Sequence, residues 1–452
     1  MTGPPVAVVG GGITGLAAAW ELVQAGPGLV EGDVRPRLGG RILTADVAGR
    51  PVDLGPDAVL ARVPHAVDLC RELGLGDELV HPAAEGASVW WGGRLRPLPP
   101  GLVMGAPQGA RDLVGLARSG LLSPAGAARA ALDVVRPATR WGPDPSVGEV
   151  VAGRLGPEVH RRLVDPLVGG IHAGPSALLS ARSTASQLAG AAESRSLVLG
   201  LRSARRGRAP EGRTGPVFAS LRGGLGRLVE RLEERLRERG AELRPGTPAE
   251  SVPVPGAAAT VLAVPAAAAA RLVAPRSPDA AADLAGVDCA SVALAVLVYP
   301  AEAVPRPLEG TGFLVPAGEG RLVTACSFGS AKWPHWAAPG DVVLRVSAGR
   351  WGDERALDLD DDRLVSRLGD ELGRMVGIAA DPITAVVTRW ERAFPQYRPG
   401  HADRVARVER ALARDLPTVF PAGAAYRGVG IAACVAQGRA AARQALASAL
   451  AG

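Results

Sequence analysis

The sequence predicts a mixed fold, α/β plus α+β, built around a Rossmann-like domain that is discontinuous in sequence. Three observations predict it. A glycine-rich turn follows an apolar strand near residue 10, a second strand–glycine–helix pattern closes the chain, and helical and strand-rich stretches lie between them. Strand, glycine turn and helix in that order are what a dinucleotide-binding turn requires. At 452 residues, the chain is expected to form two or three domains.

The first element is a predicted buried strand at residues 6–9, followed by a helix that includes residues 16–22. The turn between them is Gly10, Gly11, Gly12, Ile13, Thr14 and Gly15. Gly10 permits the tight turn, Gly12 leaves room for a pyrophosphate, and Gly15 lets helix and strand pack closely. The free N–H groups at the helix start then bind phosphate. The alternative is a glycine-rich turn that holds no ligand.

A second parallel strand is expected within residues 26–33, and it should end in an acid that binds the ribose hydroxyls. Glu31 and Asp33 are both candidates. Next comes Arg37-Leu38-Gly39-Gly40-Arg41. An acid four residues before R-x-G-G, after GxGxxG, resembles the extended fingerprint of flavin-dependent amine oxidase-like proteins. That spacing favours Asp33, with Glu31 as the alternative.

The resemblance implies FAD rather than NAD, with Gly40 and Arg41 beside the cofactor. After a predicted strand at residues 50–52, the turn Gly55-Pro56-Asp57 matches an element that lies beside the flavin ring in that family. An ordinary Gly-Pro turn is the alternative. Residues 96–107 and 165–174 resemble segments of one branch, the protoporphyrinogen and coproporphyrinogen oxidases.

The middle of the chain is expected to be helical from residue 110 to about 189, because apolar residues recur every three or four positions. Residues 195–213 hold six arginines and predict an exposed, mobile loop, either simply solvated or a guide for an acidic ligand or a partner. An amphipathic helix is expected at residues 227–239.

Strands are expected within residues 242–264. By the resemblance, residues 247–251 form the strand that meets the adenine, through backbone groups of Ala249. Residues 289–299, 312–315 and 341–346 are strand-like and predict one antiparallel sheet of a substrate domain, and residues 358–376 predict an acid-capped helix.

The C-terminal part carries the second strong motif. Residues 388–397 resemble a porphyrinogen oxidase segment in which Trp390 lies near the flavin. A strand at 419–421 precedes a glycine loop and a helix that continues to residue 449. The loop contains Gly423, Val429, Gly430 and Ile431, which by the resemblance face the flavin's pyrimidine end. A helix start there favours negative charge.

These motifs divide the chain into six expected segments. An FAD-binding domain comprises residues 1–60, 217–275 and 388–452. A substrate domain comprises residues 61–109 and 276–387. Residues 110–216 form an inserted helical domain.

Composition limits the remaining classes of function. The four cysteines and six histidines are scattered, so no metal site is expected. A net charge of +6 is spread along the chain, and no nucleic-acid partner is expected. No signal peptide, transmembrane anchor or repeat is evident, so the protein is expected in the cytoplasm.

The resemblance implies an oxygen-dependent flavin oxidase of heme biosynthesis that converts a porphyrinogen to a porphyrin, releases peroxide and passes its product to ferrochelatase. Coproporphyrinogen III is the expected tetrapyrrole, because an arginine-rich chain without a membrane anchor favours the tetra-anionic substrate, as does an actinobacterial type of composition. Protoporphyrinogen IX, another flavin amine oxidase or desaturase activity, and a non-catalytic FAD-binding protein are the alternatives. Arg62, Arg94 and Arg96 are candidate propionate partners; no catalytic side chain is predicted.

Overall fold

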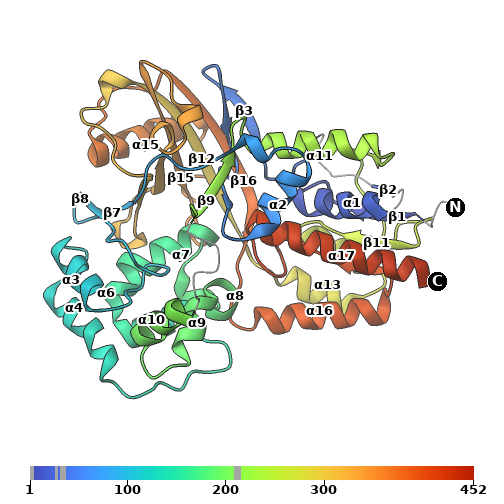
Figure 1. The fold of residues 1–452 in the computed structure, drawn as a ribbon, viewed down its shortest axis with the longest axis horizontal. Coiled ribbons are helices and arrows are strands. Elements are labelled where there is room, and N and C mark those ends of the chain that lie inside the picture. Colours follow the sequence, from blue (N-terminus) through green and yellow to red (C-terminus); the bar gives the residue numbers. More distant parts are fainter. Residues whose placement is uncertain (1–4, 26–28, 31–36, 208–214, 452) are drawn as a thin grey trace.

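The computed structural model describes residues 5–25, 29–30, 37–207 and 215–451. Its elements form three groups (Figure 1): a layered α/β unit next to both chain ends, a large sheet, and a set of helices below that sheet. The structure confirms a mixed α/β fold. Among the described residues, no helix is long and apolar enough to cross a membrane.

The layered unit is centred on a parallel sheet of three strands that come from distant parts of the chain. Its order is β1 (Val6–Val9), β11 (Ala259–Leu262) and β17 (Val419–Pro421), and Val8 pairs with Val261. Alternate residues of β1 face opposite layers, as a pleated strand requires. Val8 packs in one apolar cluster, and Ala7 and Val9 in another.

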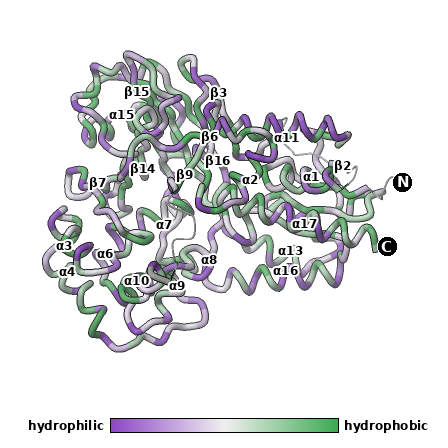
Figure 2. The backbone as a smooth tube through the Cα atoms, viewed as in Figure 1, coloured by the Kyte–Doolittle hydropathy of each residue, from purple (hydrophilic) through white to green (hydrophobic). Residues whose placement is uncertain are grey.

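Helices cover both faces of this sheet. One layer holds α1 (Ile13–Ala25), α2 (Pro64–Glu72), α11 (Gly226–Glu238) and α17 (Ile431–Ala451). The other holds α12 (Ala266–Val273), α13 (Pro278–Ala285) and α16 (His401–Asp415). The amphipathic helix expected at residues 227–239 is confirmed as α11, whose Leu228, Leu232 and Leu236 are buried. Hydrophilic and hydrophobic residues alternate along it in Figure 2.

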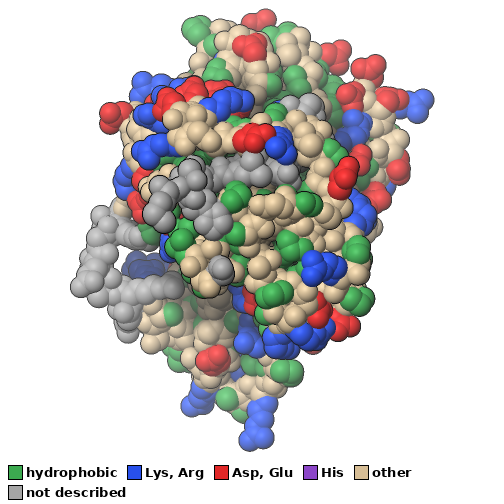
Figure 3. Space-filling model, turned by 90° about the vertical axis from the view of Figure 1, so that its right-hand side faces the viewer, with side chains coloured by type: hydrophobic (Ala, Val, Ile, Leu, Met, Phe, Trp, Pro, Cys, Tyr) green, Lys and Arg blue, Asp and Glu red, His purple; other side chains and the backbone are tan. Residues whose placement is uncertain are grey.

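Short strands surround this unit. A two-stranded parallel sheet joins β2 (Leu29–Val30) to β10 (Glu242–Leu243), and a hairpin joins β3 (Thr44–Val47) to β4 (Arg50–Asp53). A three-stranded sheet has the order β5 (Val59–Leu60), β9 (Phe218–Leu221), β6 (Leu79–Val80). Where Figure 3 shows the molecule's surface, basic and acidic side chains are interspersed.

The large sheet has seven strands in the order β16-β12-β15-β14-β13-β7-β8. Their bounds are β7 (Ser88–Trp91), β8 (Arg94–Pro97), β12 (Cys289–Pro300), β13 (Gly312–Leu314), β14 (Val323–Phe328), β15 (Asp341–Ala348) and β16 (Thr384–Pro395). The three strands expected at residues 289–299, 312–315 and 341–346 lie in this one sheet and are joined by antiparallel pairs. The sheet as a whole is mixed, because β7 comes from an earlier part of the chain and pairs with β13 in parallel.

Two different layers cover the large sheet. Leu297 of β12 packs with helix α15 (Asp361–Val376), whereas Val296 and Val298 pack with Trp333 and Trp336 on the opposite side. The expected acid-capped helix is confirmed: the side chain of Asp360 accepts a hydrogen bond from the Arg363 N–H at 2.8 Å.

The helical stretch expected at residues 110–189 is confirmed. It contains α3 (Ala110–Arg118), α4 (Pro124–Ala131), α5 (Val147–Leu155), α6 (Pro157–Val159), α7 (Asp165–His172), α8 (Ala181–Thr184) and α9 (Ser186–Ala192). A π-helical turn, His160–Val164, joins α6 to α7. Pro166 follows it and cannot donate a backbone hydrogen bond to the preceding turn.

The prediction of a loop at residues 195–213 was wrong for most of its length. Helix α10 (Leu197–Gly207) occupies it, and residues 208–214 lie outside the described part. Leu197, Val198 and Leu201 are buried with the other helices. Their spacing forms one apolar helix face, and burying that face outweighs the polar character of the arginines.

Candidate functional site

The first glycine turn leaves no room for side chains at two of its positions. Gly10 has φ +118°, and a Cβ there would lie 2.4 Å from the Ala263 carbonyl oxygen. A Cβ on Gly15 would lie 1.8 Å from the carbonyl oxygen of Gly10. Both residues must therefore be glycine for strand β1 and helix α1 to meet as they do.

The second glycine turn packs directly against the first. The N–H of Gly39 donates to the carbonyl oxygen of Gly11 at 2.8 Å, and Gly12 and Gly40 face one another. A Cβ on Gly12 would find nothing nearer than the Gly40 Cα, at 4.0 Å. The backbones of the two turns are therefore in direct contact, and the start of α1 beside them suits the approach of a pyrophosphate to N–H groups.

Arg37 holds the second turn in shape. Its guanidinium donates to the carbonyl oxygens of Gly40 and Ile42, both at 2.9 Å. The sequence identified this arginine only as the first residue of the R-x-G-G motif and did not predict its structural role. Gly55 lies against the same turn, because a Cβ there would be 2.0 Å from the Arg41 carbonyl oxygen.

Asp57 is the centre of an ion-pair cluster. It pairs with Lys332 Nζ at 2.7 Å and with Arg345 at 3.4 Å, and it accepts a hydrogen bond from the Trp333 indole at 2.9 Å. Burial alone would raise the pKa of this carboxyl, but Arg345 and Lys332 overcome that effect and hold it well below its usual range. Gly55-Pro56-Asp57 is thus fastened to the large sheet, a role the sequence did not reveal.

Asp53, three residues before Pro56, is fully buried and forms no ion pair with any described residue. One oxygen accepts hydrogen bonds from the Thr44 hydroxyl at 2.5 Å and the Leu225 N–H at 2.9 Å. Its other oxygen has no partner in the described part of the chain. Burial raises the pKa of Asp53 to about 7, because desolvation disfavours the carboxylate. Sequence reasoning also missed this residue.

The start of helix α1 packs against helix α17 about two turns after that helix begins. A Cβ on Gly438 of α17 would lie 2.2 Å from the Thr14 carbonyl oxygen, and a Cβ on Gly423 would lie 3.7 Å from Thr14 Oγ1. The two helices run in the same direction, since Glu21 of α1 pairs with Arg443 of α17 at 2.7 Å. The positive dipole end of each helix favours an anionic ligand at its own N-terminus.

The loop that precedes α17 is held by a tyrosine. Tyr397 donates from its hydroxyl to the Ala424 carbonyl oxygen at 2.6 Å and accepts from the Gly428 N–H at 2.9 Å. The His401 ring stacks on it with centroids 4.0 Å apart, and His401 Nε2 lies 2.9 Å from the Tyr426 carbonyl oxygen. These contacts hold the part of the loop that leads to Val429, Gly430 and Ile431.

Trp390 joins the large sheet to the turn at Asp57. Its indole N–H donates to the Leu54 carbonyl oxygen at 2.8 Å. We name the apolar residues around it the junction cluster: Ala173, Val292, Leu294, Trp390 and Ala393, with Leu43, Trp351 and Phe394 against them. The cluster draws on the second glycine turn, the large sheet and the end of α7.

The region expected to bind the adenosine part of the cofactor differs from the prediction. No strand forms at residues 247–251, so that prediction was wrong; Pro245, Pro248 and Pro253 interrupt the region and cannot donate to a sheet. Ala249 is half-buried against the α12–α13 layer. The two candidate ribose acids, Glu31 and Asp33, lie outside the described residues.

The three arginines expected to bind propionates do not form one group. Arg62 follows β5, and its guanidinium lies 3.5 Å from the Gly215 carbonyl oxygen. Arg94 and Arg96 belong to β8, the edge strand of the large sheet, where Arg94 is exposed. Arg96 donates to the carbonyl oxygens of Trp91 and Ser119 at 3.1 and 3.0 Å.

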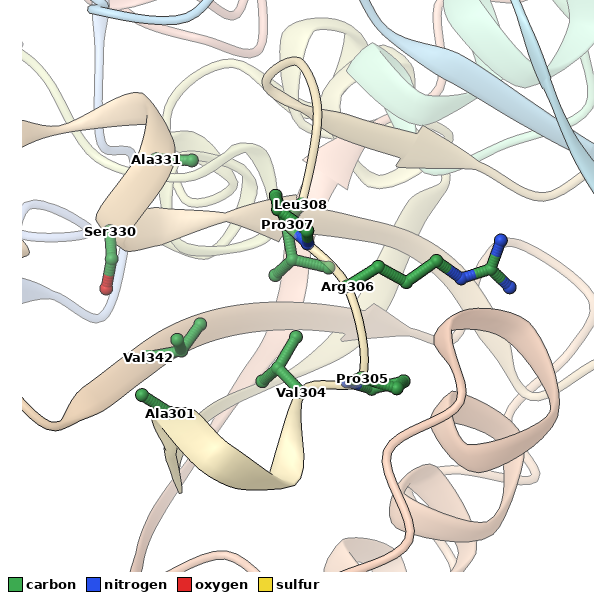
Figure 4. A pocket seen from close by; sticks show the side chains of 9 residues that line it. All are labelled: Ala301, Val304, Pro305, Arg306, Pro307, Leu308, Ser330, Ala331 and Val342. Atoms are coloured by element: carbon green, nitrogen blue, oxygen red, sulfur yellow. The ribbon is translucent and has the colours of Figure 1, made fainter.

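A cavity of about 470 Å³ lies in a different place (Figure 4). Val304 and Leu308 come from the loop after β12, Ala331 from the short helix α14 (Gly329–Lys332), and Val342 from β15. Its walls are mostly alanine, valine and proline and include no residue of either glycine turn. Arg306 and Ser330 are its polar lining residues, and the cavity contains no acid–base pair.

Comparison with known proteins places the chain among flavoproteins. Residues 13–446 match the family described as flavin containing amine oxidoreductase. A crystal structure of a protein from Exiguobacterium sp. 255-15 superposes with a TM-score of 0.86 at 30% identity, over 100% of both chains.

Curated relatives align with this chain over nearly their full lengths. Coproporphyrinogen III oxidase of Bacillus subtilis is 34% identical and is covered over 97% of its length by 98% of this chain. The enzyme of the same name from Mycobacterium tuberculosis is 38% identical, with 97% of each chain covered. Protoporphyrinogen oxidase of Macaca fascicularis is 29% identical, over 97% of this chain and 98% of its own length.

Proposed function

This chain belongs to the flavin-containing amine oxidoreductase family, and from that premise we propose that it oxidises coproporphyrinogen III to coproporphyrin III with bound FAD. The substrate loses six hydrogen atoms as its macrocycle becomes aromatic, and molecular oxygen takes them up as hydrogen peroxide. The observation that carries this proposal is the full-length similarity to curated enzymes named coproporphyrinogen III oxidase, at 34% and 38% identity.

The residues present fit FAD. Gly12 and Gly40 let the two glycine turns pack backbone against backbone, since a Cβ at Gly40 would lie only 3.0 Å from the Gly12 Cα. We propose that the turn from Gly10 to Gly15, with Gly40 and Arg41, holds the pyrophosphate. Gly423, Val429, Gly430 and Ile431 would hold the pyrimidine end, and Gly55, Pro56, Asp57 and Trp390 would lie beside the ring. FAD supplies the hydride acceptor; the chain supplies position and electrostatics.

The described residues support a mechanism without a dedicated base. His172 is buried, and burial lowers its pKa to about 4, so its imidazole is too weak a base to hold a proton at neutral pH. Asp57 is committed to Lys332 and Arg345. We infer that the rate comes chiefly from holding the porphyrinogen against the flavin in a reactive orientation.

The test is aerobic incubation of the flavin-loaded protein with coproporphyrinogen III. Porphyrin fluorescence and peroxide are expected to rise together, with three peroxide molecules per porphyrin, the number that six hydrogen atoms require. A bound yellow chromophore without turnover would support a non-catalytic FAD-binding protein instead.

Protoporphyrinogen IX oxidation is the second candidate, since the macaque relative bears that name. The two substrates differ in carrying propionate or vinyl groups at two positions, so a ratio of kcat/KM values from the same assay separates them. We further propose that the product passes to ferrochelatase.

A further inference from the structure

Arg350 differs from the other basic side chains at the end of the large sheet. Lys332 and Arg345 pair with Asp57, and Arg389 pairs with Asp361. Arg350 is half-buried, yet within the described chain its guanidinium makes no hydrogen bond or ion pair, and its Nε is fully buried without a partner. A guanidinium removed from water without an acceptor is costly, so such a group usually has a ligand.

The two carboxylates that act electrostatically on Arg350 already have other hydrogen-bond partners. Asp353 binds Arg355, with Nε–Oδ1 and Nη2–Oδ2 distances of 2.7 and 2.8 Å. Asp165 accepts hydrogen bonds from the N–H and the hydroxyl of Ser176, at 2.8 and 2.7 Å. Both acids act on Arg350 through space, but neither lies within ion-pair distance. The Nη groups of Arg350 are therefore available to another anion.

The neighbours of Arg350 fix its place at the junction cluster. A Cβ on Gly349 would lie 3.2 Å from the Ser291 carbonyl oxygen and 3.4 Å from the Val292 Cα. On the other side, the Trp351 N–H donates to the carbonyl oxygen of Ala173, the C-cap residue of α7, at 2.7 Å. Arg350 thus stands where the end of the sheet meets α7, beside the half-buried Trp351.

An unpaired cation beside an apolar, aromatic surface matches an anion carried on an apolar ring. We propose that Arg350 binds one propionate carboxylate of the porphyrinogen, with the macrocycle against the junction cluster. This inference rests on the proposed function, which does not itself require Arg350. A guanidinium suits the task because its forked donors match a carboxylate bidentately.

The test compares Arg350→Gln with the wild type in the flavin-loaded protein. We expect KM for coproporphyrinogen III, and the Kd of coproporphyrin III measured by fluorescence titration, to rise roughly 10- to 100-fold, as expected for loss of a charge-assisted bond. The bound flavin and kcat should be unchanged. Arg350→Lys should recover part of the affinity, and Arg363→Gln, at an exposed arginine of α15, should leave both constants unchanged.

A neutral ligand tests whether the effect of the substitution depends on the charge of the propionates. Wild type and Arg350→Gln should bind the tetramethyl ester of coproporphyrin III equally. Equal KM and Kd values for the acid in both proteins would overturn the inference, and so would loss of flavin from Arg350→Gln, which would make the arginine structural. Absence of turnover by the wild type would instead reject the proposed function, and the porphyrin titration would still decide on Arg350.

Discussion

Replacing Tyr397 by phenylalanine removes one oxygen atom from the support of the loop before α17. That hydroxyl donates to the Ala424 carbonyl oxygen at 2.6 Å and accepts from the Gly428 N–H at 2.9 Å. Each bond contributes about 1 kcal/mol net, and a buried group left unpaired adds to the loss. We expect Tyr397→Phe to destabilise the loop by ~2 kcal/mol and to have little effect on the rest of the fold.

The assay is FAD affinity, measured by flavin fluorescence on the apoprotein, together with the thermal midpoint. If the whole loss falls on the bound form of the loop, ~2 kcal/mol weakens FAD roughly 30-fold. The chain contains two further tyrosines, which provide matched controls. Tyr426 and Tyr299 are buried, and neither hydroxyl has a partner among the described residues, so Tyr426→Phe and Tyr299→Phe should lower neither quantity.

The comparison between Tyr397 and Tyr426 is decisive because both lie at the same loop. An unchanged FAD affinity in Tyr397→Phe would refute the reasoning that the two hydrogen bonds hold the cofactor loop. An equal loss in Tyr426→Phe would refute it as well, because the effect would then follow from aromatic packing rather than from the hydroxyl.

Other predictions concern residues away from that loop. Gly15→Ala should abolish flavin retention, because its Cβ would lie 1.8 Å from a carbonyl oxygen, whereas Gly190→Ala, with nothing within 4 Å, should leave flavin content unchanged. Asp53 has its pKa raised from 3.8 to about 7, so its contribution to stability is lost as pH rises through that window. The stability of Asp53→Asn relative to the wild type should therefore grow by about 1 kcal/mol per pH unit there, and a pH-independent difference in unfolding free energy would contradict this. Asp133→Asn should cost ~3 kcal/mol in chemical denaturation, since it leaves the buried Arg154 without its carboxylate; a loss below 1 kcal/mol would contradict this.

Local patterns made much of the fold predictable. The glycine turn at residues 10–15 depends on residues close to it in sequence, and the helix at 226–238 depends on one repeating apolar face. Both patterns can be recognised in a short stretch of sequence. The prediction of a loop at residues 195–213 was wrong because arginine content was weighed above the spacing of Leu197, Val198 and Leu201. Composition describes the surface of a helix, whereas apolar spacing decides whether it forms.

The site could be predicted only in part, because its partners are distant in sequence. Nothing near Asp57 shows that Lys332 and Arg345, almost 300 residues later, neutralise it. The burial of Asp53 likewise depends on Leu225. Arg350 carries no motif, and only three-dimensional packing distinguishes it from 50 other basic residues.

The order of strands in the small parallel sheet also governs when the protein can acquire its cofactor. Val8 and Phe420 both pair with Val261, so the sheet cannot be complete until β17 has been synthesised, more than 400 residues after β1. At ribosomal rates of about 5–20 residues per second, roughly 20 to 80 seconds pass between synthesis of the first glycine turn and synthesis of β17. We therefore expect cofactor capture only after β17 has been synthesised, and a nascent chain stalled before residue 419 should bind no flavin, however well its N-terminal motif is formed.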